Sequence, residues 1–279
     1  MISKIKLHIM SDIHLEFLKN VSCLNSLSKK IPSLFLECKF DKKETILVLA
    51  GDIGYPSTEK YWKFIEDCSL QYYKVILITG NHEYYNTHSI KHYKFSTSDK
   101  ILTIEEIDIL IKEKIKKYIN CHFLQKDAVI IDGFTFLGTT LWSNIPIDER
   151  KNIEYVVNDY KYIYKNANTN VSAKDTTEIH NDQLDWLNKN IIDNCIIITH
   201  HLPTKRLSHE KYEKYKLYNS AFMTELNEMF TDKIKMWICG HTHTPMSYVD
   251  KATGIHMITN PLGYEKENIN SKINEIELN

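Results

Sequence analysis

Short polar sequences follow five apolar runs of this 279-residue chain. The most unusual is Gly80-Asn81-His82-Glu83, which comes directly after the β-branched run at 75–79. The other four runs are followed by Asp12 and His14, by Asp52, by His200, and by His241 and His243. Apolar runs that break abruptly at polar residues predict buried strands that end in tight loops. Carboxylate, amide and imidazole groups at such strand ends are suited to metal binding and acid–base chemistry.

These strand ends supply seven oxygen or imidazole donors and no thiolate. The predicted metal ligands are Asp12, His14, Asp52, Asn81, His200, His241 and His243. Such donors favour Mn, Fe, Zn, Co or Ni over copper(I) or an iron–sulfur cluster, and Mn, Fe or Zn are expected first. Seven are too many for one ion with an open position, so we predict two ions that share Asp52 as a bridging carboxylate. A metal pair suits hydrolysis of phosphate esters by a bridging hydroxide, with His82 as the candidate general acid.

The first half of the chain predicts a parallel sheet that positions three of these groups. Apolar runs at 5–10, 44–50 and 75–79 predict strands, and Ser57 is expected to cap a helix over 58–69. Strand, helix and strand in this order predict a βαβ unit, which brings Asp12, Asp52 and Asn81 to one rim. In extended backbone, residues i and i+2 face the same side, as expected for Asp12 with His14 and for His241 with His243.

The rest of the chain predicts further helices and a second sheet. The capping box Thr103–Glu106 opens an amphipathic helix, and further helices are expected within 20–43, from Asp175, and near 219–230. Asp132-Gly133 predicts a hairpin. Strands are expected at 195–199 and 235–239, followed by a hairpin over 246–259 and a polar tail.

Two segments could form walls of the site. Residues 84–102 form either a pocket wall or a solvated loop. They include Tyr84, Tyr85, His88, His92 and Tyr93. Residues 145–174 are irregular and rich in Tyr and Asn, and are interpreted as an insertion that caps the site within a single domain over 1–279. Their tyrosines could instead simply pack.

The five motifs, in their order from residue 12 to residue 243, resemble those of calcineurin-like metallophosphoesterases. The resemblance implies an α/β fold: a four-layer α/β/β/α sandwich of two mixed sheets, with a dinuclear metal site at the C-terminal ends of the strands. It implies that one metal is held by Asp12, His14, Asp52 and His243. The other is held by Asp52, Asn81, His200 and His241, with His82 as general acid.

Four further positions have open roles. His200 is favoured over His201 as a ligand because it follows the strand directly, so His201 either supports the ligands from behind or faces the substrate. Glu83 either orients His82 or caps the following turn. Tyr84 and Tyr85 are candidates for substrate contact.

Departures from the family pattern narrow the range of substrates that we expect. Protein Ser/Thr phosphatases of this superfamily carry Arg after the Gly-Asp motif and after Gly-Asn-His-Glu. Here those places read Ile53-Gly54-Tyr55-Pro56 and Tyr84-Tyr85. Lys does not replace Arg here, because it cannot form the two parallel hydrogen bonds that Arg makes to a phosphate. The chain therefore looks closer to the small bacterial or viral-type members of the superfamily. Their expected substrates are small or nucleotide-like phosphate mono- or diesters. The alternatives are a repair-type nuclease and a non-catalytic scaffold of the same fold.

Composition gives little support to a nucleic-acid or membrane partner. The formal net charge is −1, so no basic surface favours nucleic acid, although a nucleic-acid substrate stays an alternative. The six cysteines are scattered, as expected for a reduced intracellular protein. With no signal peptide or transmembrane segment in the sequence, we expect a cytoplasmic protein; the sequence carries no signal for an oligomeric state.

Overall fold

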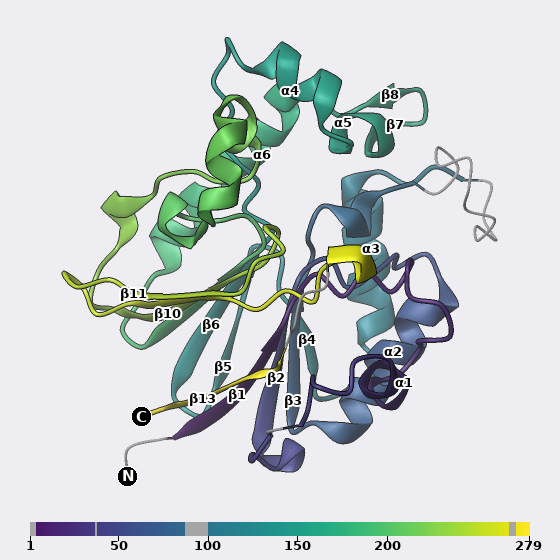
Figure 1. The fold of residues 1–279 in the computed structure, drawn as a ribbon, viewed down its shortest axis with the longest axis vertical. Coiled ribbons are helices and arrows are strands. Elements are labelled where there is room, and N and C mark those ends of the chain that lie inside the picture. Colours follow the sequence, from purple (N-terminus) through teal and green to yellow (C-terminus); the bar gives the residue numbers. More distant parts are fainter. Residues whose placement is uncertain (1–3, 37, 87–99, 268–271) are drawn as a thin grey trace.

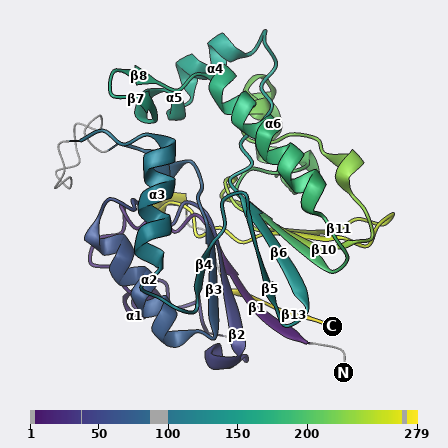
Figure 2. The ribbon, with the colours of Figure 1, turned by 180° about the vertical axis from the view of Figure 1, so that it is seen from behind.

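The computed structural model describes residues 4–36, 38–86, 100–267 and 272–279. Two mixed sheets pack face to face in the middle of the molecule, and helices cover the outer face of each (Figure 1, Figure 2). This arrangement confirms the predicted four-layer α/β/β/α class. Across the described segments, no helix combines the length and hydropathy needed to cross a membrane.

The first sheet has the strand order β13-β1-β2-β3-β4. Its four parallel strands are β1 (Ile5–Met10), β2 (Thr45–Ala50), β3 (Lys74–Ile78) and β4 (Cys121–Phe123). Its outer helices are α1 (Leu24–Lys30), α2 (Glu59–Gln71) and α3 (Ile104–Ile115). The predicted capping box of Thr103 and Glu106 is present at the start of α3.

The second sheet has the order β11-β12-β10-β9-β6-β5. Its strands are β5 (Asp127–Ile131), β6 (Phe134–Thr139), β9 (Cys195–Thr199), β10 (Ile234–Cys239), β11 (Met246–Val249) and β12 (His256–Thr259). Helix α6 (Ala173–Asn190) lies on its outer side (Figure 2). The two predicted hairpins form, and Asp132 and Gly133 turn the first with φ values of 48° and 82°.

The central strands are buried on both faces, which explains their continuous apolar runs. In β2, Ile46 and Val48 belong to the core between the sheets, whereas Leu47 and Leu49 pack under the helices of the first sheet. The parallel strands of each sheet therefore form a rigid support whose C-terminal ends carry the candidate ligands.

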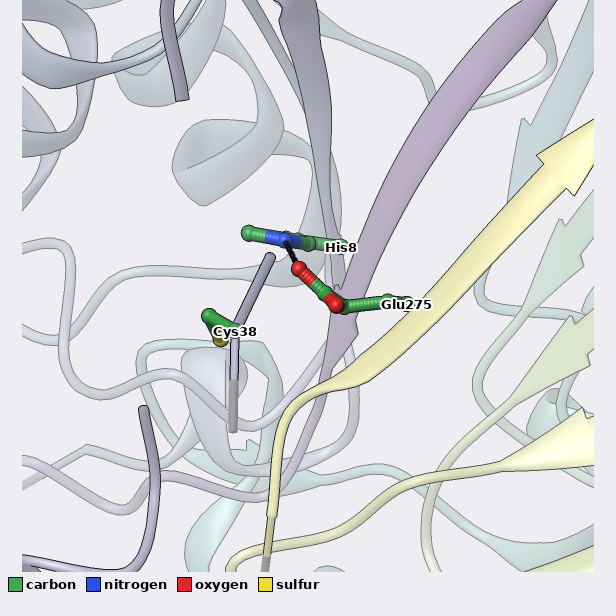
Figure 3. A group of neighbouring side chains, drawn as sticks. All are labelled: His8, Cys38 and Glu275. Atoms are coloured by element: carbon green, nitrogen blue, oxygen red, sulfur yellow. Dashed lines mark hydrogen bonds and ion pairs between the residues drawn. The ribbon is translucent and has the colours of Figure 1, made fainter. Parts of the chain in front are cut away.

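The predicted polar tail is wrong, because Asn274–Leu278 form strand β13, antiparallel to β1. Ile276 and Leu278 pack on the core between the sheets. The Glu275 carboxylate accepts hydrogen bonds from His8 Nε2 at 2.9 Å and from the Phe40 backbone N–H at 2.8 Å. Figure 3 shows His8 and Glu275 meeting across the two strands, with Cys38 close by. All six cysteines are free thiols.

Three helix predictions need correction. Thr58 rather than Ser57 caps α2, and Ser172 caps α6 in a capping box with Asp175, so α6 starts earlier than predicted. The predicted helix near 219–230 is replaced by 3₁₀ segments, η5 (Glu210–Ala221) and η6 (Asn227–Met229). Here the neighbouring segments decide the packing, because the helical pattern of the sequence is weak.

The segment 145–174 is more regular than predicted. It contains α4 (Arg150–Val156), α5 (Asp159–Tyr162) and a hairpin of β7 (Tyr164–Asn166) with β8 (Thr169–Asn170). These elements lie at the end of the molecule opposite the termini (Figure 1). His88, His92 and Tyr93 lie outside the described residues.

Candidate active site

The structure brings six of the seven predicted ligands together in two groups. Donor atoms of Asp12, His14 and His243 lie within 4.8 Å of one another, and so do those of Asp52, His200 and His241. Asp52 lies between the groups, since its Oδ2 is 3.8 Å from His14 Nε2 and 3.4 Å from His200 Nε2. Its position is suited to a carboxylate shared by two ions.

Extended backbone at these ligands would make residues i and i+2 face the same side. This predicted geometry is wrong, because the backbone there is not extended. Positive φ values occur at Asp12 (51°), His14 (50°), Asp52 (53°), His241 (73°) and His243 (43°). Non-glycine residues rarely adopt this left-handed region, and each costs conformational free energy. The surrounding fold holds five strained residues at one place, a concentration typical of functional sites.

Close packing explains why glycine precedes the polar residues. A Cβ on Gly80 would lie 2.2 Å from Asp52 Oδ1 and 2.7 Å from His200 Cε1. A Cβ on Gly51 would lie 2.6 Å from His200 Nδ1. Only glycine lets these loops approach so closely.

Three imidazoles are held in one orientation by hydrogen bonds from Nδ1. His200 Nδ1 lies 2.9 Å from the Ala50 carbonyl oxygen, and the acceptors for the other two are Glu16 for His14 (3.1 Å) and Glu267 for His243 (2.7 Å). Because each Nδ1–H donates to its acceptor, each Nε2 is the ring nitrogen that faces the site and could bind a metal ion. His14 Nε2 and His243 Nε2 lie only 3.0 Å apart, and both face carboxylates. A bound cation would satisfy these facing nitrogen and oxygen atoms together.

Asn81 provides a further test of the metal assignment. Its Nδ2 donates a hydrogen bond to Asp159 Oδ1 at 2.8 Å, which fixes the direction of the amide. Its Oδ1 is buried without a hydrogen-bond partner in the described part of the chain. Because a buried polar atom without a partner is costly, this oxygen fits a metal ligand.

The carboxylates of the site favour positive charge on two of the imidazoles. Burial lowers the pKa of His243, but contacts with Asp12 and Glu267 outweigh it and raise the pKa to about 10. Burial likewise opposes the charge of His200, whereas Asp52 raises its pKa to about 9. A bound cation would relieve the same concentration of negative charge.

His82 belongs to neither Asp-containing group and keeps its ring close to the site. Its Nδ1 lies 3.1 Å from Glu16 Oε1, and its Nε2 lies 3.3 Å from the Tyr264 hydroxyl. Its ring stacks on Tyr85, with ring centroids 4.3 Å apart. Burial lowers the pKa of His82, but Asp52 and Glu16 outweigh it and raise the pKa. These contacts hold an imidazole that can carry a proton beside the ligands.

Glu83 has a role that neither sequence-based alternative describes. Its carboxylate accepts hydrogen bonds from the backbone N–H groups of Gly80 (2.7 Å), Asp52 (2.9 Å) and Ile53 (2.7 Å). Burial and the nearby Asp52 raise its pKa to about 8. Glu83 therefore ties together the two loops that present Asp52 and Asn81.

The remaining candidates separate into a wall residue and two supporting residues. Tyr85 lines the pocket and donates a hydrogen bond to Asp159 Oδ1 at 2.7 Å. Tyr84 is buried and donates to Asp108 at 2.8 Å. His201 is buried behind the site, with its ring centroid 4.3 Å from that of His241. Tyr84 and His201 line no described part of the pocket.

The pocket over the ligands has a volume of about 310 Å³. Residues 156–159 of the predicted insertion line it, together with Tyr212, Phe222 and Tyr264. No Lys or Arg of the described segments lines it, and the two arginines of the chain contact Ile145 and Asp250 instead. A bound phosphoryl group would therefore depend on metal ions for most of its charge compensation.

Four residues that hold the site in place were not predicted from the sequence: Glu16, Asp159, Tyr264 and Glu267. Glu16 lies two residues beyond His14, which is the only local signal among them. Tyr264 is brought in by backbone hydrogen bonds from Leu262 to Ser11 and from Gly263 to Asp12. No sequence pattern predicts such pairing over this separation.

We expect Asp159→Ala to lower metal affinity about 10- to 100-fold, because Asn81 loses the acceptor that fixes its amide. Titration of the metal-free protein with Mn²⁺ would measure the change. Asp148→Ala, at an exposed position of the same segment, is the matched control and should bind as the unchanged protein does. Equal affinity of both variants would contradict the role of Asp159.

Comparison with known proteins agrees with the geometry. The model of the calcineurin-like phosphoesterase family matches residues 5–245. Uncharacterized protein L509 of Acanthamoeba polyphaga mimivirus is 32% identical over 278 residues, covering 95% of this chain and 93% of that protein. The crystal structure of the phosphopantetheinyl hydrolase PptH from Mycobacterium tuberculosis shares the fold, with a TM-score of 0.68 at 15% identity, over 96% of this chain and 92% of that one. The chain therefore belongs to the calcineurin-like phosphoesterase family, an assignment that supports metal-dependent hydrolysis of phosphoesters.

Proposed function

We propose that the protein hydrolyses small or nucleotide-like phosphate mono- or diesters at a dinuclear metal site. The observation that carries this proposal is the position of Asp52 between two groups of metal-compatible donors. The pocket above them has a volume of about 310 Å³, which suits a small substrate better than a folded protein.

The donors divide between two metal positions. Asp12, His14 and His243 would hold one ion, and His200 and His241 with the buried Asn81 Oδ1 the other. Asp52 would be shared by both. Mn, Fe and Zn suit this mixture of imidazole and oxygen ligands. When bound, such a pair neutralises phosphoryl charge and supplies an activated water.

The chain itself supplies proton transfer and orientation. His82 would donate a proton to the oxygen of the departing alcohol, since its ring lines the pocket and is held by Glu16 and Tyr264. Tyr85 and Asp159 fix the Asn81 amide and close one wall of the pocket. The positive-φ loops keep Asp52 and His241 in place before the substrate arrives.

The alternatives predicted from the sequence gain no specific support. A nuclease needs a basic path for the nucleic-acid backbone, and the described pocket wall has no Lys or Arg. A non-catalytic scaffold has no need for strained donors or for an unpartnered Asn81 oxygen. A cytoplasmic location stays a prediction. Because PptH is named as a phosphopantetheinyl hydrolase, phosphopantetheine esters belong in the substrate panel.

Substitution of His82 tests the proposal directly. We expect His82→Asn to lower kcat about 10²- to 10⁴-fold on alkyl phosphates, whose leaving groups need a proton. The loss should be much smaller on p-nitrophenyl phosphate, whose leaving group departs as a stable anion. Steady-state rates of the Mn²⁺-loaded enzyme on both substrates would measure the difference.

His122→Asn on β4, away from the pocket, is the matched control and should leave both rates unchanged. Metal analysis should find two ions in each variant. Equal losses on both substrates would contradict the general-acid role, and no activity of the metal-loaded protein on a broad ester panel would contradict the function.

A further inference from the structure

A second pocket opens beside the metal site. It has a volume of about 280 Å³ and is lined by residues from three segments: 156–157 at the end of α4, 208–223 around η5, and His241-Thr242 of the ligand loop. Five residues line both this pocket and the one over the metals. They are Val156, Val157, Tyr212, Phe222 and His241. The two spaces are therefore adjacent parts of one binding region.

The chemistry of the second pocket differs from that of the first. Val157, Tyr218, Phe222 and Met223 give it apolar and aromatic walls, and no charged side chain of the described residues lines it. Most of its wall is apolar surface, although Ser208 and Asn219 also line it. The hydroxyl of a third polar residue, Thr242, is buried without a hydrogen-bond partner in the described structure. Apolar walls with a few polar groups are typical of sites that bind an organic ring. The volume is nearly twice the roughly 150 Å³ in which an engineered cavity holds benzene.

The walls are fixed to the metal-binding loop. The Tyr212 hydroxyl donates a hydrogen bond to the Thr242 carbonyl oxygen at 2.6 Å. The rings of Phe222 and His241 lie 5.0 Å apart at an interplanar angle of 33°. Val157, Tyr218 and Phe222 pack on a small core cluster of their own, which includes Ile145 and Ile153. A ring bound here would thus lie at a defined place relative to the phosphoryl group.

We propose that this pocket holds the organic group of the phosphoester and selects substrates whose organic group carries an aromatic ring. The inference rests on the proposed function, because the phosphoryl group must occupy the adjacent metal site. Stacking on Tyr218 and Phe222 would favour a planar ring over a flexible alkyl chain. The lack of a charged lining side chain among the described residues disfavours esters of charged alcohols such as phosphoserine.

Phosphonates test the inference without the chemical step. We expect 3-phenylpropylphosphonate to inhibit the Mn²⁺-loaded enzyme at least about 10-fold more tightly than propylphosphonate, because only the former buries a ring. Val157→Asp places a charge in the pocket and should reduce this ratio to about one. Val249→Asp, an identical change at an exposed position of β11, is the matched control and should keep the ratio.

The outcomes separate the two proposals. Equal inhibition of the unchanged enzyme by the two phosphonates would overturn the ring pocket and leave the metal site intact. Failure of both phosphonates and of inorganic phosphate to bind would overturn the proposed function and the ring pocket with it. This comparison uses the unchanged enzyme, so its result does not depend on the folding of any variant.

Discussion

Asp52→Asn is expected to lower kcat/KM at least about 10³-fold and to leave one metal ion or none in the protein. The Asp52 carboxylate lies between two donor groups, and each group would lose its shared anionic ligand. One carboxylate oxygen becomes an NH₂ group, which donates hydrogen bonds and cannot coordinate a cation. Loss of one preorganised electrostatic contact already costs about 10²- to 10³-fold, and here a metal position is lost as well.

Elemental analysis after desalting would give the metal content, and steady-state kinetics with added Mn²⁺ would give the rate. Asp132→Asn makes the same change in the β5–β6 turn, where φ is 48° and Asn is readily accommodated. This control should retain two metals and full activity. An Asp52→Asn protein with two metals and a rate within about 10-fold of the unchanged enzyme would contradict the bridging role.

The strands and the candidate ligands at their ends could be located in the sequence because both depend on local sequence. Runs such as 46–49 are apolar at every position, and only a strand buried on both faces explains them in an α/β chain. Parallel pairing then requires the C-terminal ends of β1, β2 and β3 to lie at one edge of the sheet. Asp12, Asp52 and Asn81 follow these ends directly, so they come close together without any prediction of loop conformation. The Gly80-Asn81-His82-Glu83 motif also distinguishes the candidate general acid, His82, from the candidate ligand beside it, Asn81.

The residues that hold the ligands in place could not be predicted, because their signal is long-range. Glu267 fixes the tautomer of His243, yet nothing in the sequence distinguishes it from Glu265, Glu275 or Glu277. Asp159 contacts Asn81 across 78 residues of sequence. Strand β13 alternates charged and apolar residues over only Glu275–Leu278, a run too short to predict a strand without its partner β1. The role of Glu83 was missed because its hydrogen-bond donors are backbone N–H groups, which carry no residue identity.

Gly80→Ala is expected to lower the free energy of unfolding by about 1–3 kcal/mol and to weaken metal binding at least about 10²-fold. The added methyl would meet Asp52 Oδ1 at 2.2 Å, Asp52 N at 2.7 Å and His200 Cε1 at 2.7 Å. Two of these atoms belong to proposed ligand side chains, and the third is backbone held by Glu83. No flexible side-chain end is available to move aside, so the loop itself must shift. Urea denaturation and Mn²⁺ titration would measure the two effects.

Gly254→Ala separates this steric effect from the general cost of replacing glycine. Gly254 has a φ of 77°, and a Cβ there would have no neighbour within 4 Å. Its replacement should cost about 1 kcal/mol of backbone strain and leave metal affinity unchanged. If Gly80→Ala is destabilised no more than Gly254→Ala and still binds two metals tightly, the two loops have room to separate. The close approach of Asp52 to His200 would then not depend on glycine at position 80.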